Sequence, residues 1–239
     1  MSSRTLVESV SARPCLSFNI ETVDTVFPGF ALGDFAVLHG SPAVLPLALL
    51  LCVRAQLPYQ LGGLETNVLF LDGGNSFRLY EVSRIAQLHK LDPREVLKRI
   101  FISRAFTAHQ MTSLVLDELA DAVERYRSKL VVLSDFAGLY LDEDVPKKEA
   151  KEVFSQLTHC LSKFVEENRV IVVATYPPHY PSDRNLFFKM MSMGRANVTI
   201  SVNPYRYCQQ FCLEKHRVFA LGKTALSPAS LPLTRFMEA

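Results

Sequence analysis

The sequence has no stretch that is long and apolar enough to cross a bilayer. Its most apolar segment, 46–53, ends at Arg54, whereas a membrane-spanning helix needs about 20 apolar residues. The first residues, 1–11, carry charges but no apolar core of the kind that a secretory signal requires. We therefore expect a soluble cytoplasmic protein, or a nuclear one if the source is eukaryotic.

Cysteine is scarce and scattered. The chain has 5 cysteines, and most lie in apolar runs, as reduced thiols do when they pack as small hydrophobic side chains. Cys208, Cys212 and His216 could suggest metal ligands, but their spacing departs from the usual pattern. A strand there would present both cysteines simply as core residues. We expect neither a disulfide framework nor a metal site.

The chain also lacks a large excess of positive or negative charge. The net charge is +2, which is too small to predict nucleic-acid binding, so any such binding must come from local patches. The chain has no internal repeat and no low-complexity tract. A chain of 239 residues with 49% hydrophobic content can bury one sizeable core. We expect a short N-terminal tail, 1–17, followed by a single domain, 18–239.

Short apolar runs alternate with helical patterns along the chain. The runs predict buried strands of a parallel sheet, at 35–39, 67–72, 129–134, 170–175 and 198–202. Apolar residues at three- and four-residue spacings predict helices between them, at 45–56, 78–89, 112–126 and 147–167. This alternation predicts an α/β fold, a doubly wound, mainly parallel sheet with helices on both faces. Two C-terminal edge strands are expected at 209–215 and 231–235.

Motifs spread over 18–220 resemble the ATPase core of the RecA/RadA recombinases. The run 18–29, followed by Gly33-Asp34-Phe35, is similar to the start of that core. Further similarities follow in the family's order, at Gly62-Gly63, 68–72, Phe77-Arg78, 105–111, 129–140 (the Walker B strand) and 171–176. The length suits the small RadB-like paralogues, which lack the N-terminal helical DNA-binding domain. The resemblance implies a RecA-like fold.

The family's phosphate-binding loop, G-x-x-x-x-G-K-[ST], aligns with 40–47, and only Gly40 is retained. Leu45 replaces the second glycine, Pro46 the lysine that meets the outer phosphates, and Leu47 the hydroxyl that holds magnesium. Two lost charge-assisted contacts, at about 1.5–3 kcal/mol each, would weaken ATP binding on the order of a thousandfold. We expect no cofactor beyond weak ATP binding, and a strand, turn and helix that remain structural.

Other catalytic positions of the family are also changed. Gly74 stands at the position of the glutamate that activates water, and Ser134 at that of the Walker B aspartate. Asp135 follows one residue later and would point to the opposite face of the strand, although a shift in register could restore it. The phosphate-sensing Asn-Gln pair aligns with Thr175-Tyr176. The resemblance implies a pseudo-ATPase with no catalytic residue, and not an enzyme.

The tripeptide Gly222-Lys223-Thr224 spells the end of a phosphate loop a second time. The glycine required earlier in the motif is Arg217 here, and no long apolar helix follows before Pro228. We interpret Lys223 as a solvated loop residue.

Two segments align with the DNA-facing loops of the recombinases. The candidates for DNA binding in the second, 177–197, are Arg184, Phe187, Phe188, Lys189 and Arg195, and those in the first, 142–151, are Lys147, Lys148 and Lys151. Cations interleaved with rings suit single strands, which need phosphate attraction and base stacking. The alternatives are a solvated helix start for the first segment and, for the second, phenylalanines that belong to the core.

Two further places are candidates for binding a partner. Phe236 and Ala239 fit the Phe-x-x-Ala peptide with which recombinases and their mediators dock into a neighbouring ATPase core, although about one chance match is expected at this composition. Lys215, His216 and Arg217 match basic residues that the family places at a subunit face, or form an exposed basic turn.

The function that the resemblance implies is assistance to homologous recombination or DNA repair. As a degenerate recombinase paralogue, the chain would bind a RadA-type recombinase or another paralogue, single-stranded DNA, or both, and would be DNA-associated in the cell. The alternatives are a KaiC-like regulatory or scaffold protein without DNA binding, and an ATPase subunit that is active only with a partner.

Overall fold

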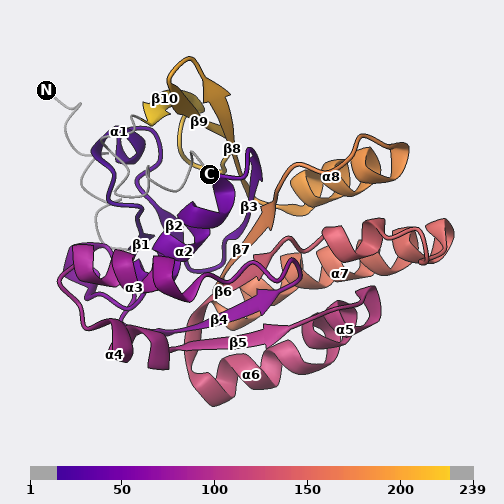
Figure 1. Ribbon diagram of the computed structural model, residues 1–239, viewed down its shortest axis with the longest axis horizontal. Helices are drawn as coiled ribbons and strands as arrows, with labels where there is room; N and C mark the ends of the chain where they lie inside the picture. The colour runs from indigo at the N-terminus through magenta and orange to yellow at the C-terminus, as the bar shows by residue number, and fades with distance from the viewer. Residues whose placement is uncertain (1–14, 227–239) are drawn as a thin grey trace, which may run out of the picture.

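The computed structural model of the protein describes residues 15–226 and is built around an eight-stranded sheet (Figure 1). The strand order is β10-β9-β8-β3-β7-β6-β4-β5. The strands are β3 (Phe35–Gly40), β4 (Asn67–Asp72), β5 (Ile100–Arg104), β6 (Ser128–Ser134), β7 (Ile171–Tyr176), β8 (Val198–Tyr205), β9 (Cys208–Lys215) and β10 (Gly222–Leu226). The strands from β8 to β5 in this order are parallel, whereas β9 and β10 are antiparallel additions. The predicted mainly parallel α/β sheet is confirmed.

Helices cover both faces of the sheet. One face carries α2 (Val44–Arg54), α3 (Leu79–Leu88) and α4 (Pro93–Lys98), and the other carries α5 (Ala108–Ser113), α6 (Leu119–Tyr126), α7 (Lys147–Asn168) and α8 (Asp183–Arg195) (Figure 1). The residues of β3 divide accordingly, since Ala36 and Leu38 join the first core and Phe35 and Val37 the second. This division follows from the alternation of side chains along a strand. It explains why the parallel strands are apolar throughout.

Shorter elements complete the fold. A small sheet pairs β1 (Cys15–Leu16) with β2 (Phe30–Ala31), and α1 (Glu21–Asp24) lies between them in sequence. Single turns of other helix types are η2 (Tyr59–Leu61), η3 (Leu114–Glu118, a π turn) and η4 (Gly138–Leu141). Within 15–226, no helix is both long and apolar enough to cross a membrane.

Two of the sequence expectations are corrected by the structure. The segment after β7, expected to be a loop over 177–197, is mostly helix α8. The Ser182 hydroxyl caps this helix by accepting from the Asn185 amide at 3.1 Å, and Phe188 and Ser192 bury one face of it at a four-residue spacing. Lys223 lies in strand β10, not in a loop.

The other predicted elements of the described chain lie close to their expected bounds. The five predicted strands are present, and the edge strand expected at 209–215 is β9. The helix expected at 112–126 is a succession of α5, η3 and α6. The edge strand expected at 231–235 lies outside the described residues.

Candidate functional site

The candidate site lies at the carboxyl edge of the parallel strands, where ligands bind in open α/β sheets. There β3 ends at Gly40, and the chain turns into α2. Gly40 has a φ of 113°, and a β-carbon at this position would clash with the Val202 carbonyl oxygen of β8. Gly40, which aligns with the first glycine of the phosphate-loop motif, is therefore required by the turn itself.

The backbone donors of this turn are already engaged within the protein. Pro42 and Pro46 have no N–H group. The N–H groups of the other four residues of 41–46 all donate within the protein. Ser41 donates to Val202 O (2.6 Å) and Ala43 to Ser41 Oγ (3.3 Å), while Val44 donates to Ser41 O (3.3 Å) and Leu45 to Pro42 O (3.2 Å). A phosphate-binding loop, by contrast, directs such N–H groups at its ligand. The turn therefore satisfies its own polar groups.

The side chains of Leu45 and Leu47, which align with the end of the phosphate-loop motif, serve packing. Leu47 is 2% exposed in the core under α2, and Leu45 packs against the same core. The Ser41 hydroxyl donates to Gln209 Oε1 on β9 at 3.0 Å. This hydrogen bond joins the turn to β9.

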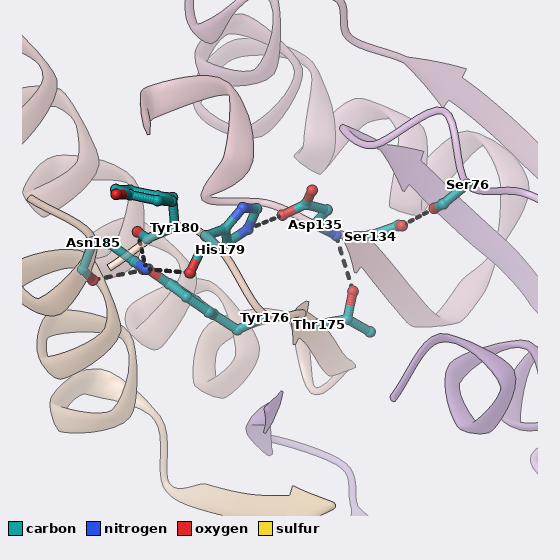
Figure 2. Close-up of polar contacts among 8 residues, drawn as sticks. All are labelled: Ser76, Ser134, Asp135, Thr175, Tyr176, His179, Tyr180 and Asn185. Carbon is teal, nitrogen blue, oxygen red and sulfur yellow. Dashed lines mark hydrogen bonds and ion pairs between the residues drawn. The ribbon is translucent and has the colours of Figure 1, made fainter. Parts of the chain in front are cut away.

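A second turn follows β4 and is organised by Asp72. This carboxylate is fully buried and accepts from the Ser76 amide (2.8 Å), the Ser76 hydroxyl (3.0 Å) and the Phe77 amide (3.1 Å), with Arg104 Nε at 3.7 Å. The Ser76 hydroxyl also contacts that of Ser134, at the end of β6 (Figure 2). Ser134 is thus tied to the β4 turn.

Asp135 leaves β6 in a left-handed backbone conformation, with a φ of 47°. Its amide donates to Thr175 Oγ1 at 2.9 Å, and its Oδ1 accepts from His179 Nε2 at 2.8 Å (Figure 2). A β-carbon at Gly74 would lie 3.0 Å from the Asp135 Cβ, and one at Gly138 would lie 2.7 Å from its Oδ2. The side chain of Asp135 therefore fills the space beside Gly74.

The tyrosine of the Thr175-Tyr176 pair also has a structural partner. The Tyr176 hydroxyl donates toward the main-chain oxygen of Asn185 at 3.0 Å and its Oδ1 at 2.6 Å, which fixes the start of α8 (Figure 2). Burial raises the pKa of this phenol well above its usual value. Thr175, as described, accepts from Asp135.

Two histidine contacts that the sequence analysis did not predict lie at this edge. His179 forms the pair with Asp135. His39, the residue before Gly40, is buried and donates from Nε2 to Glu214 Oε2 at 2.8 Å. Burial lowers the pKa of His39, and the Glu214 carboxylate partly opposes that shift. Because each pair joins residues far apart in sequence, no spacing pattern could have revealed it.

The DNA-binding role predicted for Phe188 and Arg184 is wrong in this structure. Phe188 is fully buried, with its ring 4.5 Å from that of Phe154, and Arg184 is 8% exposed and donates from Nη1 to the Asp142 carbonyl at 3.0 Å. Both face the protein because they lie on the buried side of α8. Neither is available to DNA in this structure.

The other candidates remain at or near the surface. Arg195 is exposed, Lys189 and Phe187 are half-buried, and Lys151 places its Nζ 4.9 Å from the centre of the Phe187 ring. Lys147 and Lys148 are exposed at the start of α7, where Lys148 lies 3.9 Å from Glu152. The structure thus brings the two predicted DNA-binding segments together, through this cation–π contact and the hydrogen bond from Arg184 to Asp142.

The predicted basic partner residues are engaged within the chain. Lys215 donates to the carbonyls of Met193 and Gly194 at the end of α8, at 3.1 and 3.0 Å. Arg217 pairs with Glu166 on α7 at 2.8 Å, and the His216 ring stacks on Phe219 at 4.3 Å. Phe236 and Ala239 lie outside the described residues.

Two open grooves flank α8. One, of about 540 Å³, is lined by His179, Pro181, Ser182, Asp183, Asn185, Leu186 and Lys189. The other, of about 410 Å³, is lined by Phe187, Met190, Met191, Gly194 and Arg195. In the described part of the chain, no cluster of three or more His, Cys, Asp or Glu residues could hold a metal ion, and Cys52, Cys160, Cys208 and Cys212 are free thiols.

Comparison with known proteins assigns the family. The family model described as Rad51 matches residues 43–185, which is 143 of the 239 residues. The chain belongs to the Rad51 family of the RecA/RadA superfamily. The Rad51-family match begins inside the turn after β3 and continues through β4, β6 and β7 into α8. It therefore includes most of the candidate site.

Two curated relatives carry the printed name "DNA repair and recombination protein RadA". The protein from Aeropyrum pernix is 30% identical over 159 residues, which cover 65% of this chain and 46% of that protein. The protein from Cenarchaeum symbiosum is 27% identical over 129 residues, which cover 52% of this chain and 32% of that protein. The match thus spans 32% and 46% of the length of these two relatives. They link the Rad51-family chain to proteins of recombination and repair.

Proposed function

We propose that this Rad51-family chain is a catalytically inactive recombinase paralogue, of the RadB-like kind, that assists homologous recombination or DNA repair. The observation that carries the proposal is the turn at 41–46, where two prolines lack a donor and the other four N–H groups are bonded within the protein. A nucleotide would have to break these bonds to be held in the family's manner.

The position of the water-activating glutamate supports the same proposal. Gly74 offers no carboxylate, and Asp135 fills the neighbouring space with its own carboxylate directed at His179. A general base must reach the proton that it abstracts. Here the carboxylate nearest to Gly74, that of Asp135, is already bonded to His179. We propose no resident nucleotide.

The proposed action is stoichiometric binding. A core that does not cycle ATP would cap or seed a filament of a RadA-type recombinase, or hold single-stranded DNA, without the turnover that drives disassembly. Lys151, Phe187, Lys189 and Arg195 are the surface candidates retained from the two DNA-binding segments. This role would place the protein at DNA in the cell.

The test uses the purified chain together with its cognate RadA-type recombinase. ATP hydrolysis is measured for the chain alone and for the chain mixed with a recombinase whose own ATPase has been abolished at its water-activating glutamate, so that its phosphate loop is intact. Filament assembly and strand exchange by the active recombinase are then followed while the chain is added. We expect no hydrolysis in either sample and a change in assembly that saturates at a fixed ratio of the two proteins.

Three results would count against the proposal. Hydrolysis by the chain alone would refute catalytic inactivity. Hydrolysis only in the mixture would identify a subunit that borrows its phosphate loop from a partner. Filament assembly and strand exchange that do not change would remove the role in recombination and favour a scaffold without DNA binding.

A further inference from the structure

The hairpin that joins β8 to β9 extends beyond the parallel sheet. β8 pairs with β3 only as far as Val202, opposite Gly40, but its pairing with β9 continues to Tyr205 opposite Cys208. Past Val202, no strand other than β9 pairs with β8 in the described chain. The hairpin therefore projects from the edge at which the turn after β3 lies.

Arg206 and Tyr207 form the tip of this hairpin, between the paired residues Tyr205 and Cys208. Tyr207 is 97% exposed and Tyr205 is 43% exposed. The Arg206 guanidinium lies 5.4 Å from the centre of the Tyr205 ring. The tip thus presents two aromatic rings and one cation in three consecutive residues.

Folding alone does not favour this tip. Arg206 has a φ of 51°, in the left-handed region that a β-carbon disfavours and that glycine or asparagine usually occupies in two-residue hairpin turns. A tyrosine that is almost fully exposed gains little from packing. A strained arginine beside an exposed ring is the kind of feature from which a functional role is inferred.

The chemistry of the tip suits unpaired bases. No acidic residue occurs from 199 to 213, so no carboxylate of this stretch repels a phosphate. Bases stack on aromatic rings regardless of sequence, and arginine attracts the phosphate backbone. A duplex hides the faces of its bases, whereas a single strand offers them.

We propose that Tyr205, Arg206 and Tyr207 form a stacking site for the unpaired bases of single-stranded nucleic acid. This inference rests on the proposed function and deepens it, because it moves the base contacts from α8 to the β8–β9 hairpin. Arg206 can then attract the phosphate backbone while the two tyrosine rings hold bases.

The experiment titrates a fluorescent oligothymidylate with the full chain and follows anisotropy at two salt concentrations. Tyr207→Ala should weaken binding by about fivefold or more, as expected for the loss of one stacked base. Tyr80→Ala is the matched control, since Tyr80 is 87% exposed on α3, and it should bind like the wild type. An abasic oligomer of equal length should bind the wild type and Tyr207→Ala equally.

The variant Arg206→Gly distinguishes a role of Arg206 in binding nucleic acid from a role in stabilising the fold. Glycine relieves the left-handed strain, so the variant should melt at the same or a higher temperature while binding oligothymidylate more weakly and with a shallower dependence on salt. A structural role for Arg206 would instead lower the melting temperature.

The outcomes distinguish this inference from the proposed function. If the wild type binds and the two tip variants bind equally well, the stacking site is refuted, while the effect on filaments can stand. If the wild type does not bind oligothymidylate, the stacking site is also refuted, and only the recombinase-binding arm of the function remains. If the tip variants lose the effect on filaments but keep DNA binding, the tip contacts a protein and the inference is wrong.

Discussion

Gly40→Ala tests the structural role of the glycine that aligns with the start of the phosphate-loop pattern. A β-carbon at Gly40 would clash with the Val202 carbonyl oxygen and would lie 2.7 Å from Asn203 Oδ1, on a backbone with a φ of 113°. Unfavourable backbone dihedrals cost about 1–3 kcal/mol, and a clash with backbone adds about 1–3 kcal/mol. We expect a loss of at least about 2 kcal/mol, or a melting temperature lower by at least about 4 °C for a chain of this size.

The control for this variant is the same chemical change at an open glycine. No atom lies within 4 Å of a β-carbon built at Gly194, near the end of α8. Gly194→Ala should therefore stabilise the protein by about 0.4–1 kcal/mol.

Both variants are measured by thermal unfolding, followed by circular dichroism without nucleotide. The expected shifts in melting temperature have opposite signs. A Gly40→Ala protein as stable as the wild type would refute the argument that this glycine serves the turn.

Three further predictions concern the turn, a buried histidine and a buried carboxylate. The triple variant Leu45→Gly/Pro46→Lys/Leu47→Thr should show no ATP hydrolysis in a phosphate-release assay, because Gly74 still supplies no base, and should melt lower since Leu47 is a core residue; phosphate release would contradict it. Burial holds the pKa of His39 in the folded protein below 6.5. As the pH falls, this histidine is therefore protonated first in the unfolded chain, which lowers the free energy of unfolding below about pH 6.5. Urea unfolding of His39→Gln should therefore lose less stability than the wild type between neutral pH and about pH 5, and equal losses would contradict this. The Glu81 carboxylate is buried without a hydrogen bond, and burial raises its pKa. Glu81→Met should therefore raise the free energy of unfolding, measured in urea, by about 1–3 kcal/mol. A lower free energy of unfolding for this variant would show that the attraction of Arg78 and Arg84, which lowers that pKa, outweighs the burial.

The central sheet could be predicted because its strands are apolar on both faces. Segments such as 67–72 and 129–134 lie between two layers of helices, so every residue is selected for burial. The helix α8 was missed because Phe187 and Phe188 beside lysine and arginine resembled a DNA-binding loop. The four-residue spacing of Phe188 and Ser192 was the signal that indicated a buried helix face.

The candidate site was only partly predictable. The predicted replacements at Pro46 and Gly74 rest on aligning the family's motifs with the sequence position by position, which needs no structure. The pairing of Asp135 with His179, which lie 44 positions apart, depends on how the ends of β6 and β7 meet. β10 was missed because its exposed residues alternate with half-buried ones and carry little hydrophobic signal.

The N–H groups of the turn after β3 are bonded within the protein, and this affects how the protein would respond to the concentration of nucleotide in the cell. A ligand stabilises a fold only when it binds the folded state, by an amount that grows with its concentration. With the turn donors bonded to Ser41, Pro42 and Val202, the edge of the sheet has its shape before any nucleotide arrives. We expect the abundance of such a protein, and not the ratio of ATP to ADP, to set how much of it occupies a partner.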